Sequence, residues 1–491
     1  MHSILAQQTK RIRGCSPTQI KQLIAQSDSE ITSIQNKIVA LESQIAALVE
    51  LRDRECAVGA ALRSIVAPIR ILPVELLAEI FELTISDDLD SSEEQHIRDA
   101  FKVSHVCHHW RQIADKTPQL WTGPIHVELY RKRDLKEEGI YSNGLRAWFA
   151  RSAPLSIPIT IGGVEDASRS TESGSRVAEE LLRIAFRWRS LRIIDHTTTG
   201  SLVRFLAGSR LDSLEELDLW RMNRDGWHFN PATISSFAAA SRLRKVTIDT
   251  TYGIPIPVQM PSGHPSTARG WSVPPPATLV PVVLEHLHCL SVNWIENKVF
   301  AMRLLDCLSA PALHELHLCF EPECQGMEWA EATVTSFQLR SPNITKLKIQ
   351  GQGLSIPSNA LIVALRHTPS LTHLLIEHCP GTIDDGLLQA LCYTDNVKPL
   401  VPRLHSLALT ELRKPFQEDG LASMIASRWW TDVELASRSS PPTVARWTQI
   451  ELRTVGKRPS RRFWDTLEAL RQTGLIVAWE IHTSGPSWYW Q

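Results

Sequence analysis

The chain has 491 residues, of which 43% are hydrophobic, and its 52 basic and 53 acidic residues nearly cancel. This balance excludes a strong overall attraction to nucleic acid or to anionic membranes, and the length fits several domains or one module plus a repeat array. The nine cysteines are scattered without a C-x-x-C pair, which favours a reducing compartment. Because no secretory leader or membrane-spanning apolar run is apparent, we expect a cytoplasmic or nuclear protein.

Residues 1–15 are expected to be disordered, and residues 16–67 are predicted to form one long helix. Ser16, Pro17 and Gln19 supply the start of a capping box. Isoleucine and leucine then recur with heptad spacing, at Ile24, Ile31, Ile38 and Ile45 (a positions) and at Ile34, Leu41 and Leu48 (d positions). Two interpretations remain open. The stripe forms a parallel two-stranded coiled coil with a second copy over residues 24–51, or it packs within the molecule.

Two short predicted helices after Pro68 each carry an apolar face. The first face holds Leu76, Leu77, Ile80 and Phe81, and the second, within one helix, holds Val103, Val106, Trp110 and Ile113. Thr117–Trp121 follows, with Pro118 ending the second helix. About 50 residues bury too little surface to be stable alone, so these helices predict a surface for a partner.

Residues 68–122 resemble the F-box, the helical module that binds the adaptor subunit of SCF-type cullin–RING ubiquitin ligases. The resemblance rests on LPxELLxxIF from Leu72, on FKVSxVCxxWRxIA from Phe101, and on the pair Leu120-Trp121. An acidic stretch, Ser86 to Glu94, is expected to loop into solvent. The resemblance implies that the following residues line the adaptor interface or support it: Leu72, Pro73, Leu76, Ile80, Phe81, Val106, Cys107 and Trp110.

A recurring L-x-x-L-x-L signature dominates the remainder of the chain. Its central residues lie at 191, 217, 246, 290, 316, 347, 374 and 407. Most spacings fall within or just above the leucine-rich-repeat period of about 20 to 29 residues. The pattern predicts an irregular solenoid over residues 123–478, with one strand and a returning helix or turn per repeat. A Pro-rich insertion at about 252–282 explains the longest spacing. The repeat ending at Cys379 resembles the cysteine-containing repeats often found behind F-boxes.

Side chains that alternate with the buried leucines are expected to form the ligand-reading surface of this array. One predicted row is Asp218, Thr247, Ser291, His317, Lys348, Leu375 and Ala408. The flanking row is Glu216, Lys245, Cys289, Glu315, Lys346, His373 and Ser406, with Trp220 beyond it. As target contacts we select Glu216, Asp218, Trp220, Lys245, Thr247, Ser291, His317, Lys348, His373 and Leu375. Mixed charge along these rows favours a protein target over a uniform polyanion.

No motif of a nucleotide-binding, hydrolase or metalloprotease site is present, so no catalytic residue, cofactor or metal ligand is predicted. His105, Cys107, His108 and His109 share one predicted helix and are not expected to converge on a metal. The basic stretch Lys457–Arg462 is interpreted as a solvated loop, with a nuclear-import signal as the alternative. The Trp-rich tail at 479–491 is expected to cap the last repeat.

Several segments resemble an expanded family of basidiomycete F-box proteins: Leu145–Leu155, Phe186–Leu191, the TPQLW sequence and Met424–Trp429. The predicted α/β architecture is therefore a coiled-coil-like helix, a small all-α F-box and an irregular leucine-rich-repeat solenoid. It indicates a non-catalytic substrate-recognition subunit of a ubiquitin ligase that directs a target to degradation. The alternative is a repeat scaffold that dimerises through its N-terminal helix and has no ligase role.

Overall fold

The computed structural model of the chain describes residues 16–85, 93–129, 134–162, 176–194, 206, 209–222, 237, 240–250, 281–295, 301–324, 327–351, 354–379, 381–395, 397–413, 417–438, 440–455 and 459–482. The chain divides into two compact units, Met1–Ile80 and Phe81–Gln491. The predictions for residues 1–15, for the acidic stretch up to residue 92, and for the Pro-rich insertion up to residue 280 fall outside the described residues.

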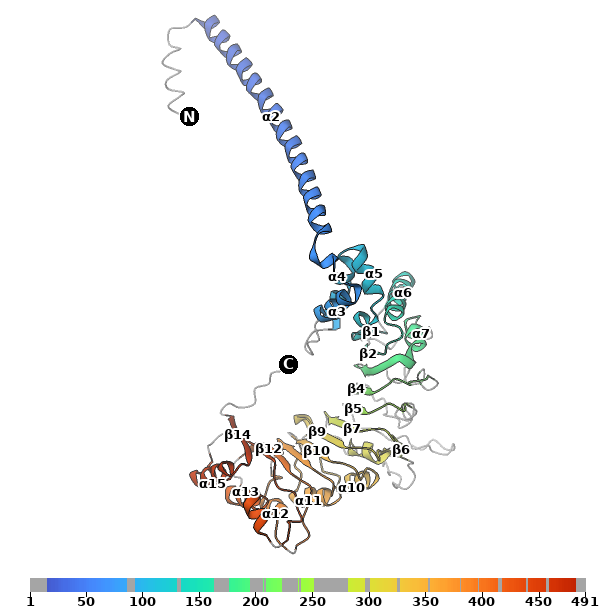
Figure 1. Cartoon of the computed structure of the whole chain (residues 1–491), viewed down its shortest axis with the longest axis vertical. Coiled ribbons are helices and arrows are strands. Elements are labelled where there is room, and N and C mark those ends of the chain that lie inside the picture. The colour runs from blue at the N-terminus through green and yellow to red at the C-terminus, as the bar shows by residue number, and fades with distance from the viewer. Residues whose placement is uncertain are drawn as a thin grey trace, which may run out of the picture. The chain divides into compact units, whose positions relative to one another are not determined.

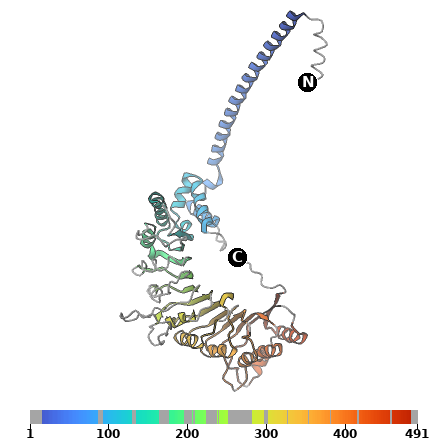
Figure 2. The same cartoon turned by 180° about the vertical axis from the view of Figure 1, so that it is seen from behind.

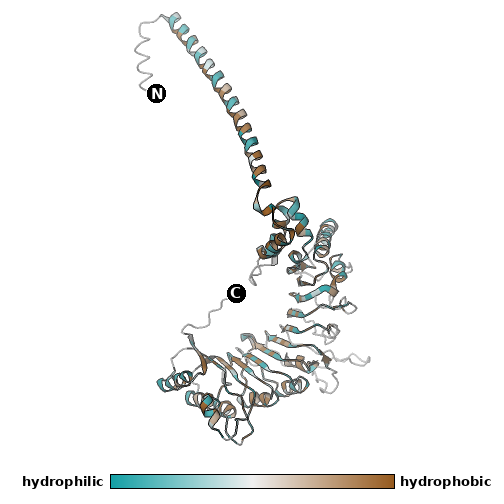
Figure 3. Cartoon of the chain, viewed as in Figure 1, coloured by the Kyte–Doolittle hydropathy of each residue, from teal (hydrophilic) through white to brown (hydrophobic). Residues whose placement is uncertain are grey.

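The predicted long N-terminal helix is present as α2 (Pro17–Ile65), and it begins at a capping box in which the Ser16 amide donates to Gln19 Oε1 at 3.0 Å. The seven apolar heptad residues from Ile24 to Leu48 are 45–65% exposed. Figure 3 shows apolar and polar residues interspersed along this helix. A short 3₁₀ turn, η1 (Pro68–Arg70), precedes α3 (Val74–Thr84).

The single second helix predicted for the F-box-like segment is wrong, because the chain forms two helices there. These are α4 (Glu93–His105) and α5 (His108–Asp115), followed by η2 (Pro118–Trp121). Cys107 is extended (φ −158°, ψ 171°) and its Sγ accepts a hydrogen bond from the Trp110 amide at 3.5 Å. The thiol therefore acts as an N-cap that starts a new helix, as a serine hydroxyl does elsewhere.

Trp121 lies at the centre of the aromatic core that follows α5. Its indole Nε1 donates to the Ala114 carbonyl at 2.7 Å. The ring lies 5.0 Å from the ring of Trp148 and 5.7 Å from that of Phe101, both edge-on, and the Arg151 guanidinium lies 4.7 Å from its centroid. This core joins the F-box-like helices to α6 (Leu135–Arg151) and to the first strand, β1 (Ile125–Glu128).

A twelve-stranded sheet forms the body of the second unit, and its strands are parallel and pair in chain order (Figure 1). After β1 come β2 (Ile157–Gly162), β3 (Trp188–Ile193), β4 (Glu216–Met222), β5 (Lys245–Thr250), β7 (Cys289–Trp294), β9 (Glu315–Phe320), β10 (Lys346–Gly351), β11 (His373–Glu377), β12 (Ser406–Arg413), β13 (Gln449–Val455) and β14 (Ile476–His482). A separate small pair joins β6 (Val282–Val283) to β8 (Leu308–Ser309). All eight signature positions fall on strands, as predicted.

Strands β1, β2, β13 and β14 were not predicted. Trp479 lies in β14, so the predicted tail at 479–491 begins inside the sheet, and residues 483–491 lie outside the described part of the chain.

Helices connect many of the strands and cover one face of the sheet. They are α7 (Arg176–Arg183), α10 (Glu331–Arg340), α11 (Ser358–Arg366), α12 (Asp385–Leu391), α13 (Glu418–Ser427), α14 (Asp432–Ser437) and α15 (Arg461–Gln472), with the 3₁₀ turns η4 (Ala185–Arg187), η6 (Ala301–Cys307) and η7 (Pro322–Cys324). Figures 1 and 2 show α10 to α15 along one side of the strands. The strand residues on that side, such as Leu316 and Leu318, are buried.

Three arginine side chains each donate hydrogen bonds to backbone carbonyls of an earlier segment that connects two strands. Arg187 donates to the carbonyls of Phe149 and Leu155, both through contacts of 2.7–2.9 Å. Arg340 binds the Leu305 and Leu308 carbonyls, and Arg428 binds those of Leu400 and Val401. Since buried carbonyls need partners, these guanidinium groups fix the turns that lead into successive strands.

Candidate functional site

The first half of the F-box-like segment presents apolar side chains to solvent. Leu76 is 46% exposed on α3 and Pro73 is exposed before it, whereas Leu72 and Ile80 are half-buried. Leu77 is fully buried and belongs to the core. Of the predicted adaptor residues in this unit, Leu76 and Pro73 are therefore the most accessible. Sequence reasoning missed Ile71 and Val74, which are also exposed, and their apolar character beside Leu72-Pro73 was the available signal.

The second half divides its predicted residues between support and exposure. Phe81 is buried, and the centroid of its ring lies 4.7 Å from the ring centroid of the half-buried Trp110. Cys107 caps α5. Val106, at the junction of α4 and α5, is 60% exposed. Phe81 and Cys107 therefore hold the helices in place, whereas the Val106 side chain is exposed to solvent.

The two rows predicted from strand alternation are brought together by the sheet. Asp218, Thr247, Ser291, His317, Lys348, Leu375 and Ala408 are successive register partners, as are Glu216, Lys245, Cys289, Glu315, Lys346, His373 and Ser406. We call these two rows the open face. The side chain of Trp220 lies outside the described residues, so its prediction has no structural counterpart.

Sequence reasoning missed a third row and both ends of this face. The third row comprises Asp249, Asn293, Cys319, Gln350, Glu377 and Thr410, which are also register partners. Ser190 and Arg192 extend the face onto β3, and Gln449 and Glu451 extend it onto β13. The same alternation of side chains would have found them.

Comparison with known families identifies the N-terminal helical module. Residues 69–125 form an F-box-like domain. F-box domains generally bind the SCF adaptor and, through it, the cullin complex, and F-box proteins are generally non-catalytic. A comparison with curated proteins finds no match. Among the helices that the structure describes, none is both long and apolar enough to cross a membrane.

Opposite charges pair across neighbouring strands of the open face. Arg192 contacts Asp218 at 2.8 Å, and Lys346 contacts Glu315 at 2.5 Å. Further along, Lys348 lies 3.6 Å from Glu377. Each such pair near the surface contributes only about 0–1 kcal/mol. Their effect is to hold long side chains in defined positions, so the face presents an ordered pattern of both charges.

Burial and hydrogen bonding shift the pKa values of several groups at the centre of this face. Burial lowers the pKa of His317 and of His373, which favours the neutral form of both imidazoles. The hydrogen bond from Lys346 lowers the pKa of the Glu315 carboxyl. Burial raises the pKa of the Cys289 thiol. One potential ligand atom from each of Cys289, Glu315 and His317 lies within 4.8 Å of the others.

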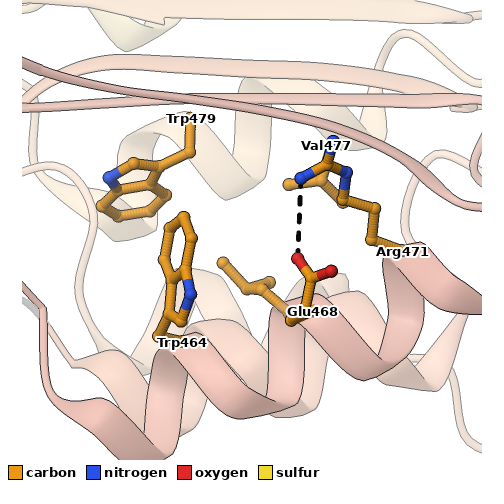
Figure 4. A pocket seen from close by; sticks show the side chains of 6 residues that line it. Trp464, Glu468, Arg471, Val477 and Trp479 are labelled. Carbon is orange, nitrogen blue, oxygen red and sulfur yellow. Dashed lines mark ion pairs between the residues drawn. The ribbon is translucent and has the colours of Figure 1, made fainter.

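A pocket of about 210 Å³ lies between α15 and β14, at the end of the sheet (Figure 4). Trp464 and Trp479 form one wall with their rings 6.2 Å apart and nearly perpendicular. Glu468 and Arg471 form an ion pair at 3.5 Å on the other side. Val477 and Leu467 complete the lining, so the pocket combines an aromatic wall with a paired charge.

Proposed function

We propose that this chain is the substrate-recognition subunit of an SCF-type ubiquitin ligase, with the F-box-like domain binding the adaptor and the C-terminal region binding a target protein. The match of residues 69–125 to the F-box-like family carries the proposal. The mechanism is proximity: the chain makes or breaks no bond, and it holds a target near a ubiquitin-charged enzyme so that the transfer becomes effectively intramolecular. The reaction belongs to the cytoplasm or nucleus.

For the C-terminal region we propose an irregular leucine-rich-repeat solenoid like that of the expanded fungal F-box family. The sequential parallel strands and the coincidence of the L-x-x-L-x-L positions with β3 to β12 support it. The open face would then be the target surface, with contacts at the residues selected from the sequence. A few of these residues are expected to supply most of the binding free energy, because hot spots are a minority of any interface.

Adaptor binding is tested with exposed residues, so that loss of binding is separable from loss of folding. We expect a Leu76→Asp/Val106→Asp variant of the full chain to lose at least ~30-fold in affinity for the purified adaptor, because a charge replaces two accessible apolar contacts. Binding is measured by co-purification and by titration calorimetry.

The control for this experiment is Val433→Asp, which places one aspartate at a 79% exposed valine on α14. This variant should bind the adaptor like the unmodified chain, and all variants should have the same circular dichroism spectrum. Equal affinity of the double variant and the control would contradict the proposed interface. Failure of the unmodified chain to bind would leave the scaffold as the better interpretation.

The second candidate function is a scaffold that dimerises through α2 without a ligase role. The observation that favours it is the exposure of all seven heptad residues from Ile24 to Leu48. Isoleucine at a and leucine at most d positions favour two parallel strands, and Lys37 at g would pair with Glu42 at e of the second copy. This is the homodimer expected over residues 24–51.

We expect an Ile34→Asp/Leu41→Asp variant to be monomeric, because two charges in each strand of the seam are incompatible with a coiled coil. Light scattering after gel filtration should then give 55.2 kDa for the variant and twice that mass for the unmodified chain. Val39→Asp is the matched control, since Val39 is 60% exposed but lies at a b position outside the seam. A monomeric unmodified chain would exclude the dimer.

A further inference from the structure

The centre of the open face places four side chains side by side on two neighbouring strands. Cys289 and Ser291 are two residues apart on β7, and Glu315 and His317 are two residues apart on β9. The two strands pair in parallel, with Cys289 opposite Glu315 and Ser291 opposite His317. Alternate residues of a strand point to the same face, so all four side chains project together.

Three of these side chains carry groups that bind transition metals well. Thiolate, imidazole and carboxylate are the usual ligands of zinc, which prefers four ligands in a tetrahedron. Ligand atoms around such an ion lie roughly 3.3–3.8 Å apart, a spacing that follows from bond lengths of about 2.0–2.3 Å. Here the sulfur, a carboxylate oxygen and an imidazole nitrogen all lie within 4.8 Å of one another. Small side-chain rotations of half-buried residues would close the remaining gap.

We propose that Cys289, Glu315 and His317 bind a divalent transition metal ion of the zinc class, with the fourth position left to water or to the Ser291 hydroxyl. Three protein ligands and one open position make an exchangeable site, unlike a closed structural site of four protein ligands. The site lies on the surface assigned to targets, yet it stands independently of adaptor binding. Its test therefore does not depend on the ligase role.

The surrounding charges set the strength and the pH dependence of this site. Lys346 lies 2.5 Å from Glu315, so a metal ion must displace an ammonium group from the carboxylate. Cys289 faces Lys245 and Glu216 on one side, and Glu315 and His317 face Lys346, Lys348 and His373 on the other. The metal ion binds Cys289 as a thiolate and His317 as a neutral imidazole, so each group must be free of its acidic proton to bind. The affinity is therefore expected to rise with pH.

The experiment uses the full chain, freed of metal by chelation and titrated with Co²⁺ and then with Zn²⁺. Cobalt bound to a thiolate shows a near-ultraviolet charge-transfer band, and tetrahedral cobalt shows intense visible bands. We expect one Co²⁺ per chain with both signatures, which Zn²⁺ then displaces. Cys289→Ser should remove the charge-transfer band, and Glu315→Gln or His317→Gln should weaken binding at least ~10-fold, the least that loss of a direct ligand should cost.

Two further variants make the outcome specific. Cys319→Ser alters a thiol on β9 that lies outside the cluster of three ligand atoms, and this change should leave cobalt binding intact. Lys346→Ala removes the competing ammonium group and should tighten binding. Circular dichroism must show that each variant folds. A cobalt spectrum without the thiolate band, or binding that is unchanged by both Cys289→Ser and His317→Gln, would overturn the proposal.

Discussion

Replacing Trp121 with alanine is expected to lower the free energy of unfolding of the second unit by about 3–5 kcal/mol. The side chain is 1% exposed, so its removal leaves a large cavity. It also leaves the Ala114 carbonyl without the indole donor now 2.7 Å away. The rings of Phe101 and Trp148 and the Arg151 guanidinium lose a shared neighbour, and aromatic pairs of this kind contribute about 0.5–1.5 kcal/mol beyond their buried area.

The effect of Trp121→Ala is measured by urea unfolding followed by far-ultraviolet circular dichroism, since tryptophan fluorescence is itself changed by the substitution. Trp464→Ala is the matched control. Trp464 is the same residue type, but it is 43% exposed and contacts Trp479 at the end of the sheet. We expect the control to cost about 1 kcal/mol or less. Equal losses for the two variants would show that Trp121 does not organise the junction between the F-box-like helices and β1.

The open face could be predicted from sequence because one rule fixes it. Once Leu217 and Leu219 are assigned to the core, alternation places Asp218 outside, and parallel register places Thr247 and Ser291 beside it. The structure reproduces both predicted rows. The cluster of Cys289, Glu315 and His317 also follows from this rule, yet it was missed. Cys289 lies 26 residues before Glu315 and 28 before His317, so no local motif joins the three residues.

The predictions that failed depended on contacts that periodicity does not record. The apolar spacing from Val103 to Ile113 fits one continuous helix, but a single cap at Cys107 divides it. Cysteine is not among the preferred N-cap residues, so the residue type did not indicate a helix start at Cys107. Likewise β13 follows Trp447, which occupies the first leucine position of the signature, and β14 contains Trp479 rather than leucine. Tryptophan therefore stands where the signature has leucine, at Trp447 and Trp479, and obscures the repeat.

The hydrogen bonds of the three arginines could not be predicted from the sequence, because their acceptors are backbone carbonyl groups, which every residue has. Arg428 is the strongest case. It is fully buried, and its two terminal nitrogens donate to the carbonyls of Leu400 and Val401 at 2.6 and 3.2 Å. Burial lowers its pKa to about 10, so the group stays charged at pH 7. Its guanidinium also lies 5.4 Å from the centroid of the Trp447 ring.

Arg428→Met is expected to lower the free energy of unfolding by about 2–4 kcal/mol. Two buried carbonyls lose their donors, and each such loss costs about 1–3 kcal/mol, while removal of a buried charge offsets part of the cost. The guanidinium also restrains a strained turn, because Val401 has a positive φ of 43°, which is a rare conformation for a β-branched residue. Urea unfolding at pH 7 measures the effect.

Two comparisons decide whether loss of the Arg428 hydrogen bonds causes the lower free energy of unfolding. Arg366→Met changes an exposed arginine at the corresponding end of α11, and it should alter the free energy of unfolding by less than about 0.5 kcal/mol. In a Val401→Gly background, where the positive φ is no longer strained, Arg428→Met should cost measurably less than it does in the unmodified chain. If the cost is the same in both backgrounds, the arginine satisfies carbonyls without restraining the turn. If Arg428→Met behaves like Arg366→Met, its hydrogen bonds do not stabilise the sheet.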